Sequence, residues 1–198
     1  MAVADILTGP VKVYYAAVGT AIPARDTVAY GAAWTAPWTA LGYTKEGLTV
    51  NYETEELEVM IQEALAAVKR VRTKESLTLE SVLAELTGTN LALLVGQAKT
   101  TGAAGAGVVG YEELLVGGAW IIPEKAWGFE GLYTDTSGNS LPVRFYIFKG
   151  TAKVNGELQF SKEEYPGIAF QVQMLEDPTG TRGARSFEFQ KVTAPATA

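Results

Sequence analysis

The side chains with the greatest capacity for chemistry in this sequence are four carboxylates that lie close together. They are Glu53, Glu55, Glu56 and Glu58. Carboxylate oxygens are the preferred ligands of a hard cation such as Ca²⁺, so this group has the chemistry to hold one. The segment lacks the Asp, Asn and Gly spacing of a calcium-binding loop, and a solvated acidic surface is therefore the favoured interpretation.

Two further groups are weaker candidates. Glu163 and Glu164 could act as acid and base, but adjacent residues on a turn point apart. Gly105, Gly107 and Gly110 match a G-x-G-x-x-G pattern, but no clear strand precedes them and no helix follows, as a nucleotide site requires. The sequence contains no His and no Cys, which removes the usual general base, the thiolate nucleophile and the commonest transition-metal ligands. We therefore expect no catalytic residues, no cofactor, no metal site and no enzymatic activity.

The composition is that of a folded, acidic protein. Of the 198 residues, 47% are apolar and 19% are charged, so we expect one domain over residues 1–198 with flexible termini at 1–9 and 193–198. The net charge of −6 argues against nucleic-acid binding, because contact with phosphates needs a basic surface. No apolar run approaches the roughly 18 residues of a membrane span, and the first residues do not have the pattern of a secretory signal. We expect no membrane partner.

A basic group follows the acidic group closely. It consists of Lys69, Arg70, Arg72 and Lys74. An acidic segment followed by a basic one predicts two complementary patches, which suit head-to-tail self-association between different surfaces of two copies. We take these eight charged residues as candidate contacts between subunits, carried by a long loop or hairpin around residues 51–70. We also expect charge reversal at Arg70 and Arg72 to weaken assembly more than folding.

Short runs of β-branched and aromatic residues, separated by turn residues, predict many short strands. The expected strands cover residues 11–18, 38–43, 48–52, 57–62, 68–86, 111–116, 120–122, 126–133, 141–148 and 186–192. Residues 87–90 provide helix-start residues and Gly96 a helix-ending residue, so we expect one short helix at residues 91–95. Residues 19–37 should form a long structured loop, and the Gly/Ala-rich residues 99–107 a surface loop or a contact that orders on assembly. These elements predict an antiparallel β-sandwich or barrel with one short flanking helix.

The most regular pattern in the chain lies between residues 149 and 178. Polar and apolar residues alternate along residues 149–160, a polar turn follows at 162–167, and alternation returns from Ile168 to Leu175. Alternation on both sides of a Pro-Gly turn predicts an antiparallel hairpin with one buried face.

Five motifs follow one another along the chain. They are GYTKEGLTVNYETEELEV from residue 42, LAELT from residue 83, NLALLVG from residue 90, VNGELQFSKEE from residue 154 and MLEDP from residue 174. In this order and spacing, the chain resembles the tail tube proteins, or major tail proteins, of long-tailed, non-contractile bacteriophages. The resemblance covers most of residues 38–178.

The resemblance implies a β-sandwich or barrel flanked by a helix, six copies of which form a ring. Rings stack into the tail tube, through which DNA leaves the head and enters the host without specific binding. The implied partners are other copies of this chain and other tail proteins. The implied location is the virion tail, after synthesis in the host cytoplasm. The long loop or hairpin around residues 51–70 would reach a neighbouring copy, and the termini would also bridge copies.

Two alternatives stay open at this point. The chain could form another ring of such a system: a tail terminator, a baseplate ring or a secretion-system tube. It could instead be a carbohydrate- or host-binding β-sandwich module, because tryptophan rings offer flat apolar surfaces to sugars. The tryptophans available for that role are Trp34, Trp38, Trp120 and Trp127.

Overall fold

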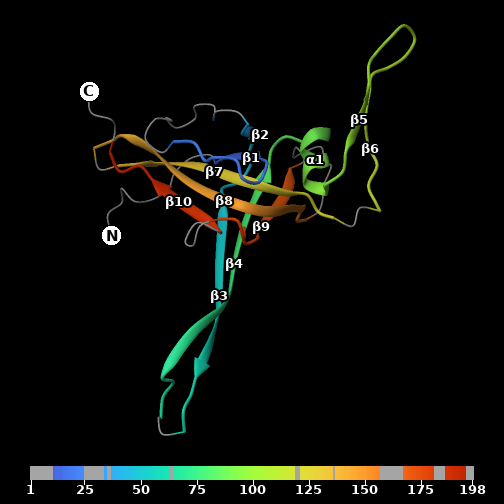
Figure 1. Ribbon diagram of the computed structural model, residues 1–198. Helices are drawn as coiled ribbons and strands as arrows, with labels where there is room; N and C mark the ends of the chain where they lie inside the picture. The colour runs from blue at the N-terminus through green and yellow to red at the C-terminus, as the bar shows by residue number, and fades with distance from the viewer. Residues whose placement is uncertain are drawn as a thin grey trace.

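The computed structural model shows a chain made mostly of strands joined by short connections (Figure 1). It describes residues 11–24, 34, 37–62, 65–118, 121–135, 137–156, 167–180 and 186–194. The elements are β1 (Lys12–Ala16), β2 (Thr39–Tyr43), β3 (Thr49–Val59), β4 (Lys69–Leu83), α1 (Gly88–Val95), β5 (Lys99–Gly102), β6 (Tyr111–Leu114), β7 (Glu124–Thr134), β8 (Ser140–Val154), β9 (Ile168–Met174) and β10 (Phe187–Lys191).

The strands form one large antiparallel sheet and one separate hairpin. The large sheet has the order β2-β1-β7-β8-β9-β4-β3, with β10 also paired to β8, and the hairpin joins β5 to β6. Strand β8 pairs with β10 at residues 143–147 and with β9 at residues 150–154. The sheet therefore divides at β8 into two layers, whose inner faces share one hydrophobic core. The expected antiparallel sandwich with one short flanking helix is confirmed for the described part of the chain.

The core lies between these two layers. Alternate residues of β4 and β9 point into it, as Leu79 and Val172 do with no exposed surface. Val13 of β1 and Trp127 of β7 meet them from the other layer. The Trp127 indole N–H donates to the carbonyl of Gly150 at 3.3 Å, which satisfies its one polar group. The predicted alternation of buried residues after residue 167 is confirmed in β9.

Strand β7 is buried on both of its faces. On the face away from the core, the Trp34 ring stacks on Tyr14, with ring centroids 4.0 Å apart. A Cβ atom at Gly128 would lie 2.2 Å from Cζ3 of Trp34, so glycine is needed for this close approach. Along the same face, the buried Arg144 donates from Nε to Oε1 of the buried Glu130 at 2.9 Å. The sheet thus has a second buried layer outside its main core.

Helix α1 begins and ends at its capping residues. The Thr87 hydroxyl accepts a hydrogen bond from the backbone N–H of Asn90 at 3.1 Å, and Gly96 adopts a left-handed φ of 74°. The Asn90 side chain also donates to the carbonyl of Leu41 at 2.9 Å, which ties the helix to β2. In the described part of the chain, no helix has the length and apolar composition needed to cross a membrane.

Two pairs of expected strands are each one strand. Residues 48–52 and 57–62 join in β3, because pairing with β4 continues through the charged residues between them. Residues 141–148 join the first arm of the expected hairpin at 149–160, in a strand that extends to Val154. Charged and glycine residues lower local β propensity, but a neighbouring strand can sustain the pairing through them.

Three other expectations are wrong in part. Strand β4 ends at Leu83 and does not continue to Leu86. Residues 99–102 of the expected Gly/Ala-rich loop form β5, and residues 121–122 of the expected strand at 120–122 belong to no strand. Some predictions fall outside the described residues, namely those on the turn at 162–166, on Trp120 and on most of the two termini.

Candidate assembly interface

The largest exposed feature of the molecule is a hairpin arm that extends away from the two-layered body (Figure 1). We define the arm as residues 54–62 and 65–75, at the far ends of β3 and β4. Every residue of β3 is exposed, and β4 is exposed from Lys69 to Glu75 before its alternate residues enter the core at Leu77. A two-stranded hairpin alone is marginally stable in water. The arm therefore has little support from its own subunit, which makes it the candidate surface for contact with another molecule.

A β-bulge gives the arm two different faces. Glu55 pairs with Lys74 and Glu56 pairs with Arg72, so Thr73 is the extra residue on β4. The Thr73 hydroxyl donates to the carbonyl of Glu55 at 3.2 Å. Paired residues in adjacent antiparallel strands share a face, so an extra residue on one strand reverses its alternation. Beyond the bulge, the residues of β4 have therefore changed sides relative to the core.

One face of the arm is charged. It carries Glu56 and Glu58 from β3, which pair with Arg72 and Arg70 from β4. Nη2 of Arg70 lies 2.6 Å from Oε1 of Glu58, and Nη1 of Arg72 lies 2.5 Å from Oε1 of Glu75. The hydrogen bond to Glu75 raises the pKa of the Arg72 guanidinium further above its ordinary value, and arginine is charged at any physiological pH in either case. Exposed ion pairs contribute little to stability, and their main effect is to keep this face hydrated.

The opposite face of the arm is apolar toward the tip, beyond the ion pair of Glu55 with Lys74. Leu57 pairs with Val71, and Val59 pairs with Lys69. Leu57 is 58% exposed and Val71 is 41% exposed, although both are large aliphatic residues. The tip beyond them adds the exposed side chains of Met60, Ile61, Leu65 and Val68. Exposed apolar side chains grouped on a projecting element make this face a candidate contact site for a macromolecule.

The eight charged residues predicted as contacts lie on the arm or at its base. The expected separation into an acidic and a basic patch is wrong, because antiparallel pairing sets the two segments side by side within one subunit. Nζ of Lys74 lies 2.7 Å from Oε1 of Glu55, and this hydrogen bond raises the pKa of Lys74. Glu53 lies nearer the body, where its carboxylate accepts a hydrogen bond from the Asn51 side chain at 3.0 Å. The contact role of these residues stays a prediction.

Sequence reasoning missed the apolar half of this surface. Leu57 and Val59 alternate with Glu56 and Glu58, which is the pattern of a strand with one apolar face. That signal is present in the sequence. The contribution of Val71 could not be found in this way, since it depends on the bulge.

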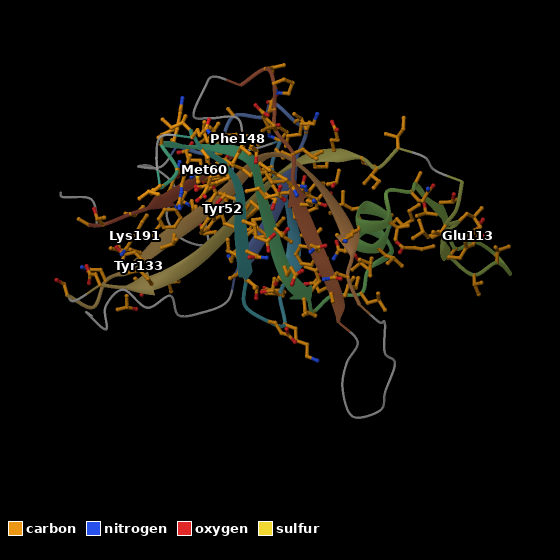
Figure 2. The ribbon with its side chains drawn as sticks, turned by 90° about the horizontal axis from the view of Figure 1, so that it is seen from below. Tyr52, Met60, Glu113, Tyr133, Phe148 and Lys191 are labelled. Atoms are coloured by element: carbon orange, nitrogen blue, oxygen red, sulfur yellow. The ribbon has the colours of Figure 1, made fainter. Side chains whose placement is uncertain are left out.

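A second hairpin, β5 with β6, extends from another part of the body and points away from the arm (Figure 1). Its base is held near α1, where Nζ of Lys99 lies 2.6 Å from Oε1 of Glu112 and donates to the Thr89 hydroxyl at 2.9 Å. Seen along the arm, Glu113 lies on the far side of α1 from the sandwich (Figure 2). Large exposed apolar side chains gather on this hairpin and the segment after it: Val108, Val109, Tyr111, Leu115, Val116, Ile121 and Ile122.

The three tryptophans that the structure describes do not form a ligand surface. Trp34, Trp38 and Trp127 are 4%, 8% and 1% exposed, and all three pack within the body. The stacking role considered for Trp34 and Trp38 is therefore wrong, since a sugar needs an open ring face. Among the described residues, no group of three or more acidic side chains is arranged to hold a metal ion.

Comparison with known families agrees with this architecture. The family model described as phage tail tube protein matches residues 4–189 of the 198-residue chain. The matched range includes both layers of the sandwich, the helix, the arm and the second hairpin. No curated protein matches the chain. The extent of the family match shows that this chain belongs to the phage tail tube protein family.

Proposed function

We propose that copies of this chain assemble into hexameric rings, that the rings stack into the tail tube, and that DNA passes through this tube into the host. Family membership supports the coarser statement, a structural protein of the phage tail that is located in the virion. The observation that carries the proposal is the arm, an amphipathic hairpin with no core of its own subunit beneath it.

Self-assembly is supported by where the exposed apolar residues lie. Most of the large exposed apolar side chains of the described residues belong to the arm or to the β5–β6 hairpin with the segment that follows it. The two hairpins point in different directions (Figure 1). Contact between different surfaces of identical subunits closes into a ring or continues as a filament, and a stacked tube uses both kinds of contact.

Passage of DNA is supported by the charge of the subunit. The chain carries a net charge of −6, and three of the basic residues of the arm, Arg70, Arg72 and Lys74, lie beside carboxylates that offset them. DNA binds proteins mainly where cationic side chains replace its counterions. An acidic tube therefore lets DNA slide without holding it.

Electron microscopy of the purified chain over a concentration series, with and without a crowding agent, tests the proposal. We expect hollow rings or tubes with six-fold end views. Thr54 and Glu75 are paired directly, so a variant with Asn-Gly in place of residues 55–74 closes the hairpin without the arm. This matched control should fold and remain monomeric.

Two outcomes would contradict the proposal. One is an intact chain that stays as single particles at every concentration. The other is an armless variant that forms tubes as readily as the intact chain. Single rings that never stack would instead indicate another ring component of the tail, such as a terminator or a baseplate ring.

A further inference from the structure

We propose that the apolar face of the arm docks on the outward face of β6 in a second copy of the chain, with Lys69 of one copy against Glu113 of the other. This inference rests on the proposed self-assembly and names both surfaces of one contact. The outward face of β6 is defined here by Tyr111 and Glu113, together with Leu115, the residue just after the strand.

The outward face of β6 is separated from the face that holds the hairpin to the body. Glu112 lies on the side of α1, where it pairs with Lys99. Alternation along a strand puts Tyr111 and Glu113 on the opposite side. Tyr111 pairs with Gly102, and a Cβ atom at Gly102 would lie 2.2 Å from Cε1 of Tyr111, so the ring covers the glycine.

This face combines apolar area with one carboxylate. Tyr111 is 53% exposed and Leu115 is 74% exposed, and both are residue types that are seldom left open to water in a group. Glu113 is exposed, and it forms no ion pair with any residue that the structure describes. Such a face would bind a partner surface that is apolar and carries one cation.

The apolar face of the arm has the complementary composition. Leu57, Val59 and Val71 form its apolar area. Lys69 lies on the same face, paired across the arm with Val59. Arg70, on the charged face, has an ion-pair partner within the arm, whereas Lys69 has none among the described residues. The other lysine of this face, Lys74, is already paired with Glu55. Lys69 is therefore the cation that matches Glu113 beside Tyr111 and Leu115.

The directions in which the two hairpins point indicate that the partner of β6 is a second copy of the chain. The arm and the β5–β6 hairpin leave the body on opposite sides (Figure 1), so the arm of one copy cannot reach β6 of the same copy. A second copy displaced along the arm and also sideways, toward the β5–β6 hairpin, brings its own arm to the first copy's β6 (Figures 1 and 2). This contact joins unlike surfaces and repeats from copy to copy, as stacking of rings requires. Nucleic acid is a poor occupant, because Glu113 would repel its phosphates.

Cross-linking tests the contact directly, because the natural chain contains no cysteine. A chain with both Val59→Cys and Leu115→Cys, assembled and then oxidised, should give a ladder of disulfide-linked multimers on a non-reducing gel. Each single variant should give no ladder. The pair Val18→Cys and Leu115→Cys is the matched control, because Val18 is also partly exposed but lies off the arm; it should remain monomeric on the gel.

Charge exchange provides the second measurement. Lys69→Glu and Glu113→Lys should each raise the critical concentration for tube formation about tenfold, because each places like charges together in the contact. The two changes in one chain should restore it to within about twofold. Lys153→Glu, an exposed change of the same charge elsewhere, is the control and should have no effect.

The two measurements separate this inference from the proposed function. One outcome is that tubes form normally while no ladder appears and the exchanged pair does not rescue assembly. In that case the proposed docking surface is wrong, and the proposed tube function still stands. If the unmodified chain never assembles, both proposals are overturned. Circular dichroism of each variant shows that its subunit is folded, and the cysteine variants keep the test decisive if a charge variant does not fold.

Discussion

Replacing the two central residues of the apolar face, Leu57→Thr with Val71→Thr, should impair assembly and leave the subunit folded. Burying a Leu or Val side chain completely contributes about 1.5–3 kcal/mol. Leu57 is 58% exposed and Val71 is 41% exposed, so docking can add about half of that for each, or about 2 kcal/mol in all. Threonine removes most of this gain, because its hydroxyl must lose water on docking. It keeps the β propensity of the arm, since threonine is β-branched.

A loss of about 2 kcal/mol corresponds to about a 30-fold rise in the critical concentration for assembly. Sedimentation of polymer at increasing protein concentration measures this value. Val18→Thr, a change of similar exposure away from the arm, should shift it less than twofold. Thermal unfolding of the unassembled subunit should be nearly unchanged, because both residues of the arm are exposed there. An unchanged critical concentration in the double variant would refute the argument that the apolar face is buried on assembly.

Three more predictions concern folding, pH and charge. Gly128→Ala should lower the free energy of unfolding by about 2 kcal/mol and the melting temperature by about 4–8 °C, because the added Cβ atom would meet the indole ring of Trp34. Gly47→Ala is the control in the same melting experiment, because the atom added there meets nothing. Hydrogen bonds from the side-chain amide and backbone N–H groups of its own turn lower the pKa of Asp135. The carboxylate therefore contributes stability above its ordinary pKa, and this contribution is lost as pH falls through the lowered value; an NMR titration should show the low midpoint, and Asp135→Asn should remove that acid-side dependence. Glu in place of both Arg70 and Arg72 should reduce polymer yield more than it lowers the unfolding temperature, and an unchanged yield would remove these two residues from the contact.

The parts of the fold that depend on local signals could be read from the sequence. The caps of α1 are an example, because Thr87 and Gly96 act within one turn of the helix. The buried alternation from Ile168 to Met174 is another, since it depends only on which residues are apolar. The sandwich follows from the number and type of such segments.

The parts that depend on partners distant in the sequence could not be read in this way. Val71 joins Leu57 only because Thr73 is an extra residue in the ladder, and nothing near Thr73 in the sequence indicates a bulge. The burial of Trp34 depends on a glycine in β7 that has no side chain. The pairing of β3 with β4 also turned two charge patches into cross-strand ion pairs, which the linear order of the charges does not show.

The acidic composition of β3 also affects the tendency of the free subunit to aggregate. This strand is the last of the large sheet and has a described neighbour on one side only, so its other edge offers backbone groups to any passing strand. Two such edges meeting in antiparallel fashion would crowd several glutamates together, and the repulsion discourages fibre-like aggregation. The free subunit can therefore stay unpaired at this edge even at high concentration. The glutamates of β3 therefore slow the pairing of free subunits into the wrong polymer.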